Sequence, residues 1–262
     1  MSRRKRPRFE ASTLKSRGRS PSQSRPSAAH WEVARAAGYR KAIPFLCEGR
    51  GRQAHAVAFY FPGEAAPCDR LCGAEYLGNF FLHPHAPIRL HGAQFICAEA
   101  AYQAMKRPTD CLEAFQGCTG QEAFDLSRSL PSKAAPDRLK VMESVLRQKF
   151  PAGSALAKQL IETKNLFLQL GDDSMPLCPR LEHNSARRDD FWSDNFDGSG
   201  KNWLGALLML QRFQLMSEED EWRPFLQRNL NLELQTTSSA WDSVVRQARQ
   251  GRAEREATTS CG

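Results

Sequence analysis

Apolar residues recur with the period of an α-helix through most of the chain after residue 95. The clearest case is 137–149, where Leu139, Met142, Val145 and Leu146 fall on one stripe and charged residues fall on the opposite side. The same pattern predicts helices over residues 98–106, 121–129, 154–163 and 202–216, and a polar, charged helix or a frayed tail over residues 238–256. The chain is therefore expected to be rich in helix.

Strand signals are fewer and lie before residue 95. The run Ala-Val-Ala-Phe-Tyr-Phe at 56–61 is apolar, rich in aromatic residues and stopped by a Pro-Gly pair, and residues 88–90 precede a His-Gly turn. Together these patterns predict a mainly α fold with a few short β-strands, of the α+β class. We expect folded structure to begin near His55.

The net charge of +8 is confined to one end of the chain. Residues 1–26 hold nine basic residues and one acidic residue, so the remaining residues are electrically balanced. We predict a basic, Ser/Arg/Pro-rich and largely disordered tail over 1–54, a folded domain over 55–216 and a charged helical extension over 217–262. Because the body is neutral, its charge does not indicate a nucleic-acid-binding domain.

The tail bears on location and partners. Its Arg-Arg-Lys-Arg cluster at residues 3–6 resembles a nuclear-import signal, the alternative being a solvated arm that touches nucleic acid. No run approaches the roughly 20 apolar residues needed to span a bilayer, and the tail lacks the apolar region of a signal peptide. We expect an intracellular protein, nuclear or cytoplasmic with the nucleus favoured, and no membrane partner.

Cysteine usage and motif content exclude several classes of protein. The eight cysteines are too sparse for a small disulfide scaffold and are expected to be thiols, mostly buried. Cys68, Cys72, His83 and His85 do not match a common structural-zinc spacing, so no metal is expected. The chain has no P-loop, dinucleotide-binding glycine pattern or serine elbow, and we expect no cofactor.

The helix expected at 98–106 is apolar or small on nearly every side, so its polar side chains need partners. Glu99, Gln103 and Lys106 follow i, i+4 and i+7 spacing and share one face, with Tyr102 alongside. One interpretation is a solvated stripe or an internal salt bridge between Glu99 and Lys106. The other is a polar ligand site formed by a carboxylate, an amide and an ammonium group that face a cleft.

A second candidate region is the Asp-Gly-Ser-Gly turn that begins at residue 197 and runs into the apolar helix at 202–216. Asn202 is suited to cap that helix, and exposed amides at a helix start bind phosphate. The plainer interpretation is a glycine turn that only starts a core helix. Trp192 and Trp203 flank the turn and suit either core packing or stacking on a nucleobase.

Three segments, taken in order, carry a family resemblance. They are LGNFF at 77–81, AEAAYQAMK at 98–106, and FW at 191–192 followed by DGSGKNWLGALLM at 197–209. They resemble the NADAR family of N-glycosidases, named for an association with NAD and ADP-ribose, over about residues 59–214. The resemblance implies a compact, mainly helical fold and hydrolysis of the bond between a ribose C1 and a base nitrogen.

The resemblance also implies the site residues. The family's motif residues fall on Asn79, Glu99, Gln103, Lys106, Trp192 and Asn202. Glu99 and Lys106 are the catalytic candidates. The substrate-binding candidates are Asn79, Gln103, Trp192 and Asn202 from the motifs, with Tyr102, Asp194, Asp197, Gly198 and Trp203 from the same segments.

The proposed chemistry agrees with these residue types. Cleavage of an N-glycosidic bond builds positive charge on the ribose C1, so a carboxylate beside C1 stabilises that state and directs a water. Glu99 is the candidate for this role. Lys106 is expected either to neutralise a phosphate or, with a lowered pKa, to attack C1 and form an imine.

The substrate is the less constrained expectation. Known family substrates include ribosylamino intermediates of riboflavin synthesis, and other members remove ADP-ribose from guanine in nucleic acid. Ala100 and Ala101 stand where the family usually has aromatic or histidine side chains, which enlarges the pocket or removes a contact. A roomier pocket and the basic tail favour ADP-ribosylated nucleic acid over a riboflavin-pathway intermediate. A non-catalytic ADP-ribose-binding module is the alternative from another class.

Overall fold

The computed structural model of the chain describes residues 43–47, 52–61, 74–133, 137–163, 166–172, 189–195, 198–216 and 222–260. The basic cluster at 3–6, Cys68, Cys72 and Asp197 lie outside the described residues. The described α-helices are α3 (Ala98–Met105), α4 (Gly120–Ser129), α5 (Arg138–Lys149), α6 (Ala155–Glu162), α7 (Trp203–Leu215), α8 (Arg223–Asn229) and α9 (Ser239–Ser260). Two 3-10 helices are η2 (Glu75–Leu77) and η3 (Thr109–Phe115).

The strands form three small sheets. Their bounds are β1 (Ile43–Cys47), β2 (Arg52–Phe61), β3 (Ile88–Leu90), β4 (Ala93–Phe95), β5 (Phe167–Asp172), β6 (Leu230–Asn231) and β7 (Thr236–Thr237). One sheet has the order β1-β2-β5, and the hairpins β3-β4 and β6-β7 make the other two. The expected mainly helical α+β fold is confirmed.

The three-stranded sheet joins distant parts of the chain. β1 pairs with β2 antiparallel, and β2 pairs with β5 parallel in a register that sets Ala56 opposite Phe167. A parallel pair requires a long crossover connection. Here the crossover contains η2, the β3-β4 hairpin and the helices α3 to α6. These helices are therefore inserted in the sequence between two strands that are neighbours in the sheet.

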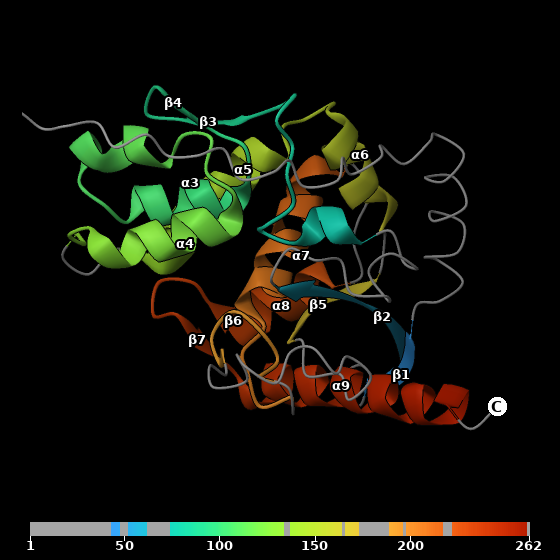
Figure 1. Ribbon diagram of the computed structural model, residues 1–262. Helices are drawn as coiled ribbons and strands as arrows, with labels where there is room; N and C mark the ends of the chain where they lie inside the picture. The colour runs from blue at the N-terminus through green and yellow to red at the C-terminus, as the bar shows by residue number, and fades with distance from the viewer. Residues whose placement is uncertain are drawn as a thin grey trace, which may run out of the picture.

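Helix α7 connects this helical part to the sheet. It contacts β5, α5, α6 and α8, and it runs through the middle of the molecule in Figure 1. Gly205 sits where a Cβ would collide with the carbonyl oxygen of Leu168 in β5. Glycine is therefore required because the helix backbone packs directly against the strand backbone.

Polar residues fix the starts of the crossover helices. Thr119 and Glu122 form a capping box at α4, in which the Thr119 amide and hydroxyl donate to the Glu122 carboxylate and Thr119 Oγ1 accepts from the Glu122 amide. The Asp137 and Ser154 side chains accept from the backbone at the starts of α5 and α6. These caps supply acceptors for helix-start amides that have no partner inside the helix.

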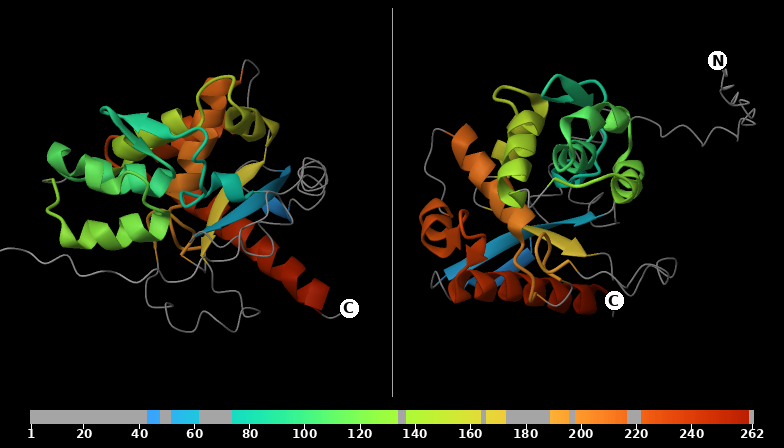
Figure 2. Two further views of the ribbon diagram at one scale, coloured as in Figure 1. Left: turned by 45° about the horizontal axis from the view of Figure 1, so that its top comes forward. Right: turned by 90° about the vertical axis from the view of Figure 1, so that its left-hand side faces the viewer.

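The C-terminal extension is packed onto the same core. Trp222 and Trp241 are fully buried, and their rings lie 5.1 and 5.5 Å from the ring of Phe167 in β5. Helix α9 contacts β1, and in Figures 1 and 2 it lies on the opposite side of the sheet from α3 and α4. The expectation of a helix after residue 238 is confirmed, and α9 reaches Ser260.

One sequence-based expectation about the fold is wrong, and one strand has no counterpart among the predicted elements. Folded structure begins before His55, because β1 ends at Cys47 and β2 begins at Arg52. Strand β5 was not predicted as a strand at all. It is short, and its partner β2 lies over a hundred residues earlier, so no local hairpin pattern marks it.

Among the described helices, none is long and apolar enough to cross a membrane.

Candidate active site

Helix α3 places the first group of candidate residues. Cys97 is extended and caps the helix, with its Sγ accepting from the Ala100 amide at 3.5 Å. Glu99, Tyr102 and Gln103 are all buried, whereas Lys106 at the end of the helix is half-buried. The predicted solvated stripe is therefore wrong, since the polar face of α3 lies inside the protein.

Glu99 and Gln103 are hydrogen-bonded within that face. Gln103 Nε2 donates to Glu99 Oε1 at 2.6 Å, and the Glu99 amide donates to the carbonyl oxygen of Asn79 at 2.9 Å. Asn79 is also buried, so the LGNFF segment packs directly against the start of α3. Within the described chain, Asn79 Oδ1 and Gln103 Oε1 have no hydrogen-bond donor. Two buried acceptors thus stand unsatisfied beside one carboxyl group.

The surroundings of Glu99 favour its neutral form. Burial raises the pKa of the carboxyl group above its ordinary value, and the negative charge of Asp189 raises it further. Hydrogen bonds from Gln103 and Asn79 and the positive charge of Lys106 lower the same pKa and oppose that effect. A carboxyl group balanced in this way is typical of a residue that exchanges a proton during a reaction.

Lys106 is not an ion-pair partner of Glu99. In the part of the chain that the structure describes, no ion pair or hydrogen bond of Lys106 is present, and its Nζ lies 4.3 Å from the centre of the Tyr102 ring. Burial lowers the pKa of Lys106, the charge of Glu99 raises it, and the charges of Arg107 and Arg138 lower it. The predicted internal salt bridge between Glu99 and Lys106 is therefore wrong. The ammonium group of Lys106 is available to donate hydrogen bonds to another acceptor.

The aromatic side of the site comes from the loop before α7. Tyr102 meets Trp192 edge to face with ring centres 5.5 Å apart, and Trp192 meets Phe191 edge to face at 4.9 Å. Asp189 Oδ1 accepts from the amides of Phe191 and Trp192 at 3.1 and 2.8 Å. This carboxylate fixes the backbone that presents Trp192 to Tyr102. Asp189 was missed at the sequence level because the motif begins only at Phe191.

In the described part of the glycine turn and the helix start after it, six backbone amides donate within the protein and are not offered to a phosphate. The amides of Gly198 and Gly200 donate to the Asp194 carbonyl oxygen, and those of Lys201, Asn202, Trp203 and Leu204 donate to the carbonyl oxygens of residues 190, 193, 191 and 192. The expectation of exposed amides at this helix start is therefore wrong. The turn instead holds the Trp192 loop against the start of α7.

The other candidates in this turn have their described contacts within the protein. Asn202 is fully buried and occupies the N-cap position of α7 in a left-handed conformation, but its side chain makes no capping hydrogen bond; its Nδ2 donates to the Leu168 carbonyl oxygen at 2.9 Å. Trp203 is fully buried with its ring near Phe191, and Asp194 is fully buried as well. Gly198 has a φ of 82° and packs against the Arg246 backbone, so a side chain there would be strained.

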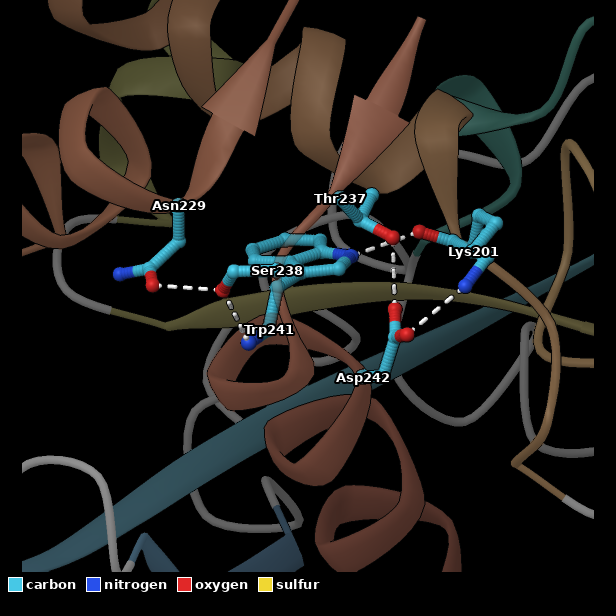
Figure 3. Close-up of polar contacts among 6 residues, drawn as sticks. All are labelled: Lys201, Asn229, Thr237, Ser238, Trp241 and Asp242. Carbon is cyan, nitrogen blue, oxygen red and sulfur yellow. Dashed lines mark hydrogen bonds and ion pairs between the residues drawn. The ribbon is translucent and has the colours of Figure 1, made fainter.

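Residues of the C-terminal extension hold the same turn through an ion pair and hydrogen bonds (Figure 3). Lys201 Nζ pairs with Asp242 Oδ2 at 2.7 Å, and Trp241 Nε1 donates to the Lys201 carbonyl oxygen at 2.7 Å. Thr237 Oγ1 donates to Asp242 Oδ1, also at 2.7 Å. The loop carrying Trp192 is thus held by Asp189 at its start and by α9 at its end.

Lys149 is a buried cation that sequence reasoning placed on the wrong face. It is only 2% exposed, and its Nζ donates to the carbonyl oxygens of Leu77 and Gly78 at 3.3 and 2.7 Å. Burial lowers the pKa of Lys149 to about 7. Its spacing from Met142 and Val145 continues the apolar stripe of α5, which is the signal that it points inward. It fixes the two residues directly before Asn79.

Ala100 and Ala101 do not enlarge a pocket. Both residues are fully inaccessible to solvent and belong to the hydrophobic core. The expectation of a roomier pocket at these positions is therefore wrong.

Across the described ranges, no cluster of three or more His, Cys, Asp or Glu side chains is arranged to hold a metal ion. The described thiols Cys97, Cys111 and Cys118 are free, and only Cys97 is fully buried.

Comparison with known proteins gives two matches. A riboflavin biosynthesis protein of Vibrio vulnificus is 32% identical over 165 residues, which make up 61% of this chain and 38% of that protein. The chain therefore spans well under half the length of this relative. The NMR structure of the Escherichia coli protein YbiA matches with a TM-score of 0.46 and 23% identity, over 63% of this chain and 90% of that one. No protein-family model matches the chain.

The Vibrio relative agrees with the resemblance found in the motifs. Ribosylamino intermediates of riboflavin synthesis are among the known NADAR substrates, and the relative is named for riboflavin biosynthesis. The resemblance of this chain to the NADAR family is confirmed.

Proposed function

We propose that this chain, as a NADAR-like protein, is an N-glycosidase that hydrolyses the bond between a ribose C1 and a base nitrogen. The observation that carries the proposal is the buried Glu99 carboxyl group, hydrogen-bonded to Gln103 and flanked by two amide oxygens that have no donor among the residues described. A buried carboxyl group with unsatisfied acceptors beside it is suited to a sugar, which brings hydroxyl donors and develops positive charge during the reaction.

In the proposed reaction Glu99 acts beside the ribose C1. As the C1–N bond breaks, its electron pair leaves with the base and C1 becomes positively charged. The Glu99 carboxylate stabilises that charge and takes a proton from a water whose oxygen bonds to C1. The proton taken by Glu99 passes, directly or through solvent, to the base nitrogen, which restores the carboxylate and leaves the free base and the free sugar as products. Ionisation of Glu99 is required at the start of this step.

The neighbouring side chains have matching roles in binding. Asn79 Oδ1 and Gln103 Oε1 accept hydrogen bonds from ribose hydroxyl groups, which would satisfy both buried acceptors. Trp192 is half-buried and offers a ring for stacking on the base, with Tyr102 as its edge-to-face support. Lys106, when protonated, neutralises a substrate phosphate. Alternatively its neutral amine attacks C1, the base leaves with the C1–N electron pair, the ribose ring opens to an imine, and water hydrolyses the imine to free the sugar; the lowered pKa of Lys106 favours the neutral amine that this second role needs.

Two substrates are favoured by different observations. The relationship to a riboflavin biosynthesis protein favours a ribosylamino intermediate of that pathway. The basic residues at 1–26 favour ADP-ribosylated guanine in nucleic acid, with the tail as a second contact to the polyanion and as a nuclear address. Deleting residues 1–28 should leave hydrolysis of free nucleotides unchanged and abolish nuclear accumulation if the tail only targets the protein.

The proposal is tested by release of base from a panel of N-ribosides that includes both substrates. We expect Glu99→Gln to lower the rate by about a hundredfold or more, since it removes the charge beside C1 and keeps the shape. Glu113→Gln, an exposed glutamate of η3, is the matched control and should leave the rate unchanged. Equal rates for wild type and Glu99→Gln would exclude Glu99 from the reaction. Binding of ADP-ribose with no release from any member of the panel would instead support the non-catalytic alternative.

A further inference from the structure

Asn79 is fixed by helix α5 through both its backbone and its side chain. Lys149, the last residue of α5, donates to the carbonyl oxygens of the two residues before Asn79. Met142 lies two turns earlier on the same helix, and its sulfur accepts from Asn79 Nδ2 at 3.8 Å. Both residues of α5 are buried, Met142 to within 1% of full burial. The buried stripe of α5 therefore contacts the residue that stands beside Glu99.

The backbone around Asn79 leaves only the side-chain amide free to turn. The Asn79 carbonyl oxygen accepts from the Glu99 amide at 2.9 Å, so the backbone is fixed on both sides of the Asn79 Cα. The terminal torsion of an asparagine side chain is soft, and its two orientations exchange the positions of the oxygen and the nitrogen. One orientation offers a ligand an acceptor, and the other offers it a donor. The neighbours of the amide decide between them.

Two acceptors set the observed orientation. Asn79 Nδ2 donates to Met142 Sδ, and the Asn79 side chain also hydrogen-bonds to the Glu99 carboxyl group, which lowers the pKa of Glu99. Turning the amide over would place its oxygen against the sulfur and the carboxylate, and all three are acceptors. The orientation that is left presents Asn79 Oδ1, which has no donor in the part of the chain that the structure describes.

Met142 and Glu99 differ in how constantly they hold the amide. A protonated carboxyl group loses its charge and gains a donor, so Glu99 selects the nitrogen of Asn79 less strongly when it is neutral, the form that burial favours. A thioether does not titrate, and it accepts hydrogen bonds without donating any. Met142 therefore favours the same orientation of the amide in both protonation states of Glu99.

We propose that Met142 is a positioning residue, whose sulfur fixes the Asn79 amide with Oδ1 towards the bound sugar, so that the site selects a sugar with a hydroxyl group at that place. The inference rests on the proposed function for the presence of a sugar beside Glu99. A sugar that lacks this hydroxyl group leaves Oδ1 buried without a donor, which costs affinity. The site is thus specific for ribosides over a corresponding deoxyriboside.

The test measures binding by the full chain, so it does not depend on turnover. Ribose 5-phosphate, 2-deoxyribose 5-phosphate and 3-deoxyribose 5-phosphate are titrated and followed by NMR, and the missing hydroxyl group is the only difference between the probes. We expect wild type to prefer ribose 5-phosphate over at least one deoxy probe by about three- to tenfold, as for one hydrogen bond to a buried acceptor. Met142→Leu nearly keeps the volume and removes the sulfur, so it should lower that preference to within about twofold.

A spectroscopic measurement separates the orientation of the amide from a loss of packing. In wild type the Nδ2 protons of Asn79 point at the Met142 thioether and should show a nuclear Overhauser effect to its methyl group. In Met142→Leu the amide turns over more freely, so the effect from these protons to the methyl groups at position 142 should weaken. Met209→Leu makes the same replacement at a fully buried methionine of α7 and is the matched control. It should keep both the sugar preference and the Overhauser effect.

The possible results separate this inference from the proposed function. An unchanged preference or an unchanged Overhauser effect in Met142→Leu would overturn the inference, and so would equal changes in Met209→Leu. Wild-type protein that binds the three probes equally, or binds none of them, would overturn it as well. If Met142→Leu changes both readouts but wild type hydrolyses no N-riboside, the positioning role stands and the proposed hydrolysis fails. If Glu99→Gln stops hydrolysis and Met142→Leu changes neither readout, the hydrolysis stands and the positioning role fails.

Discussion

Gln103 donates a 2.6 Å hydrogen bond to Glu99 from one turn further along α3, and this bond competes with burial for the charge of the carboxyl group. Burial raises the pKa of Glu99, whereas the Gln103 bond lowers it. Gln103 is therefore one of the groups that set the pH at which the Glu99 carboxylate is present. The side-chain oxygen of Gln103, Oε1, has no donor among the described residues and can accept a hydrogen bond from a sugar hydroxyl group.

Gln103→Leu should move the acidic limb of the kcat/KM profile to higher pH. The carboxylate is the active form, so the rate falls as the pH falls through the pKa of Glu99. Loss of the Gln103 donor removes a contribution that lowers this pKa, so the fall begins at higher pH. The profile is measured with the N-riboside that wild type hydrolyses fastest.

Gln121→Leu provides the control for this shift. Gln121 also donates to a carboxylate one turn away, to Asp125 Oδ2 at 2.9 Å, but on the exposed face of α4. Its replacement should leave the pH profile in place. An acidic limb that stays at the wild-type pH in Gln103→Leu would show that the Glu99 titration does not govern the reaction.

Lys149 should make the stability of the protein increase with pH above neutrality. Its pKa is lowered from 10.5 to about 7 by burial, so between these values the unfolded chain binds more protons than the folded protein. The free energy of unfolding then rises with pH, by at most about 1.4 kcal/mol per pH unit. The destabilisation caused by burying Lys149 is fully present below pH 7. Urea unfolding between pH 6 and 9 measures the slope.

The variant Lys149→Met should lack this slope. Lys140→Met changes an exposed lysine of the same helix and should keep it. The window ends at pH 9 because burial raises the pKa of Cys97 from 9.0 to about 11, so between these values the folded protein binds more protons and its stability falls as the pH rises, opposite to the effect of Lys149. Identical slopes in wild type and Lys149→Met would show that the lysine is charged in the folded protein near pH 9.

The sequence predicted elements well where the signal is local. The helices α3 to α7 were located within a residue or two, because their apolar spacing and caps lie inside each segment. Glu99 and Gln103 were paired correctly because i, i+4 spacing alone brings them together on a helix. The same argument failed for Glu99 and Lys106, since the ammonium group lies over the Tyr102 ring instead.

Contacts between distant segments could not be predicted in this way. Asn202 was assigned to capping from its place before α7, but its side chain bonds to Leu168, a residue in an unpredicted strand. Lys149 was assigned to the charged face, although its target is a pair of carbonyl groups 71 and 72 residues earlier. In both cases tertiary structure supplies a partner that no local pattern encodes.

Trp241 should be a major stabilising residue of the whole molecule. It is fully buried against Phe167 and Phe225, so Trp241→Ala should cost about 3–5 kcal/mol in the free energy of unfolding. Trp241→Phe keeps most of the packing but loses the hydrogen bond to the Lys201 carbonyl oxygen, at a cost of about 1–2 kcal/mol.

Leu234→Ala is the reference for these unfolding measurements, because Leu234 is 71% exposed. It should change stability by no more than about 0.5 kcal/mol. A Trp241→Ala protein as stable as Leu234→Ala would mean that α9 is not part of the cooperative core. The sheet and the Trp192 loop would then be stable without it.

Asp189→Asn should move the acidic limb in the opposite direction to Gln103→Leu. The charge of Asp189 raises the pKa of Glu99, so its removal lowers that pKa and extends activity to lower pH. Asparagine keeps an oxygen that accepts from the Phe191 and Trp192 amides, so the Trp192 loop should keep its place. Asp190→Asn removes the neighbouring, exposed charge and should shift the limb less. If Asp189→Asn moved the limb upward, or if Asp190→Asn moved it as far, the coupling between Asp189 and Glu99 would be refuted.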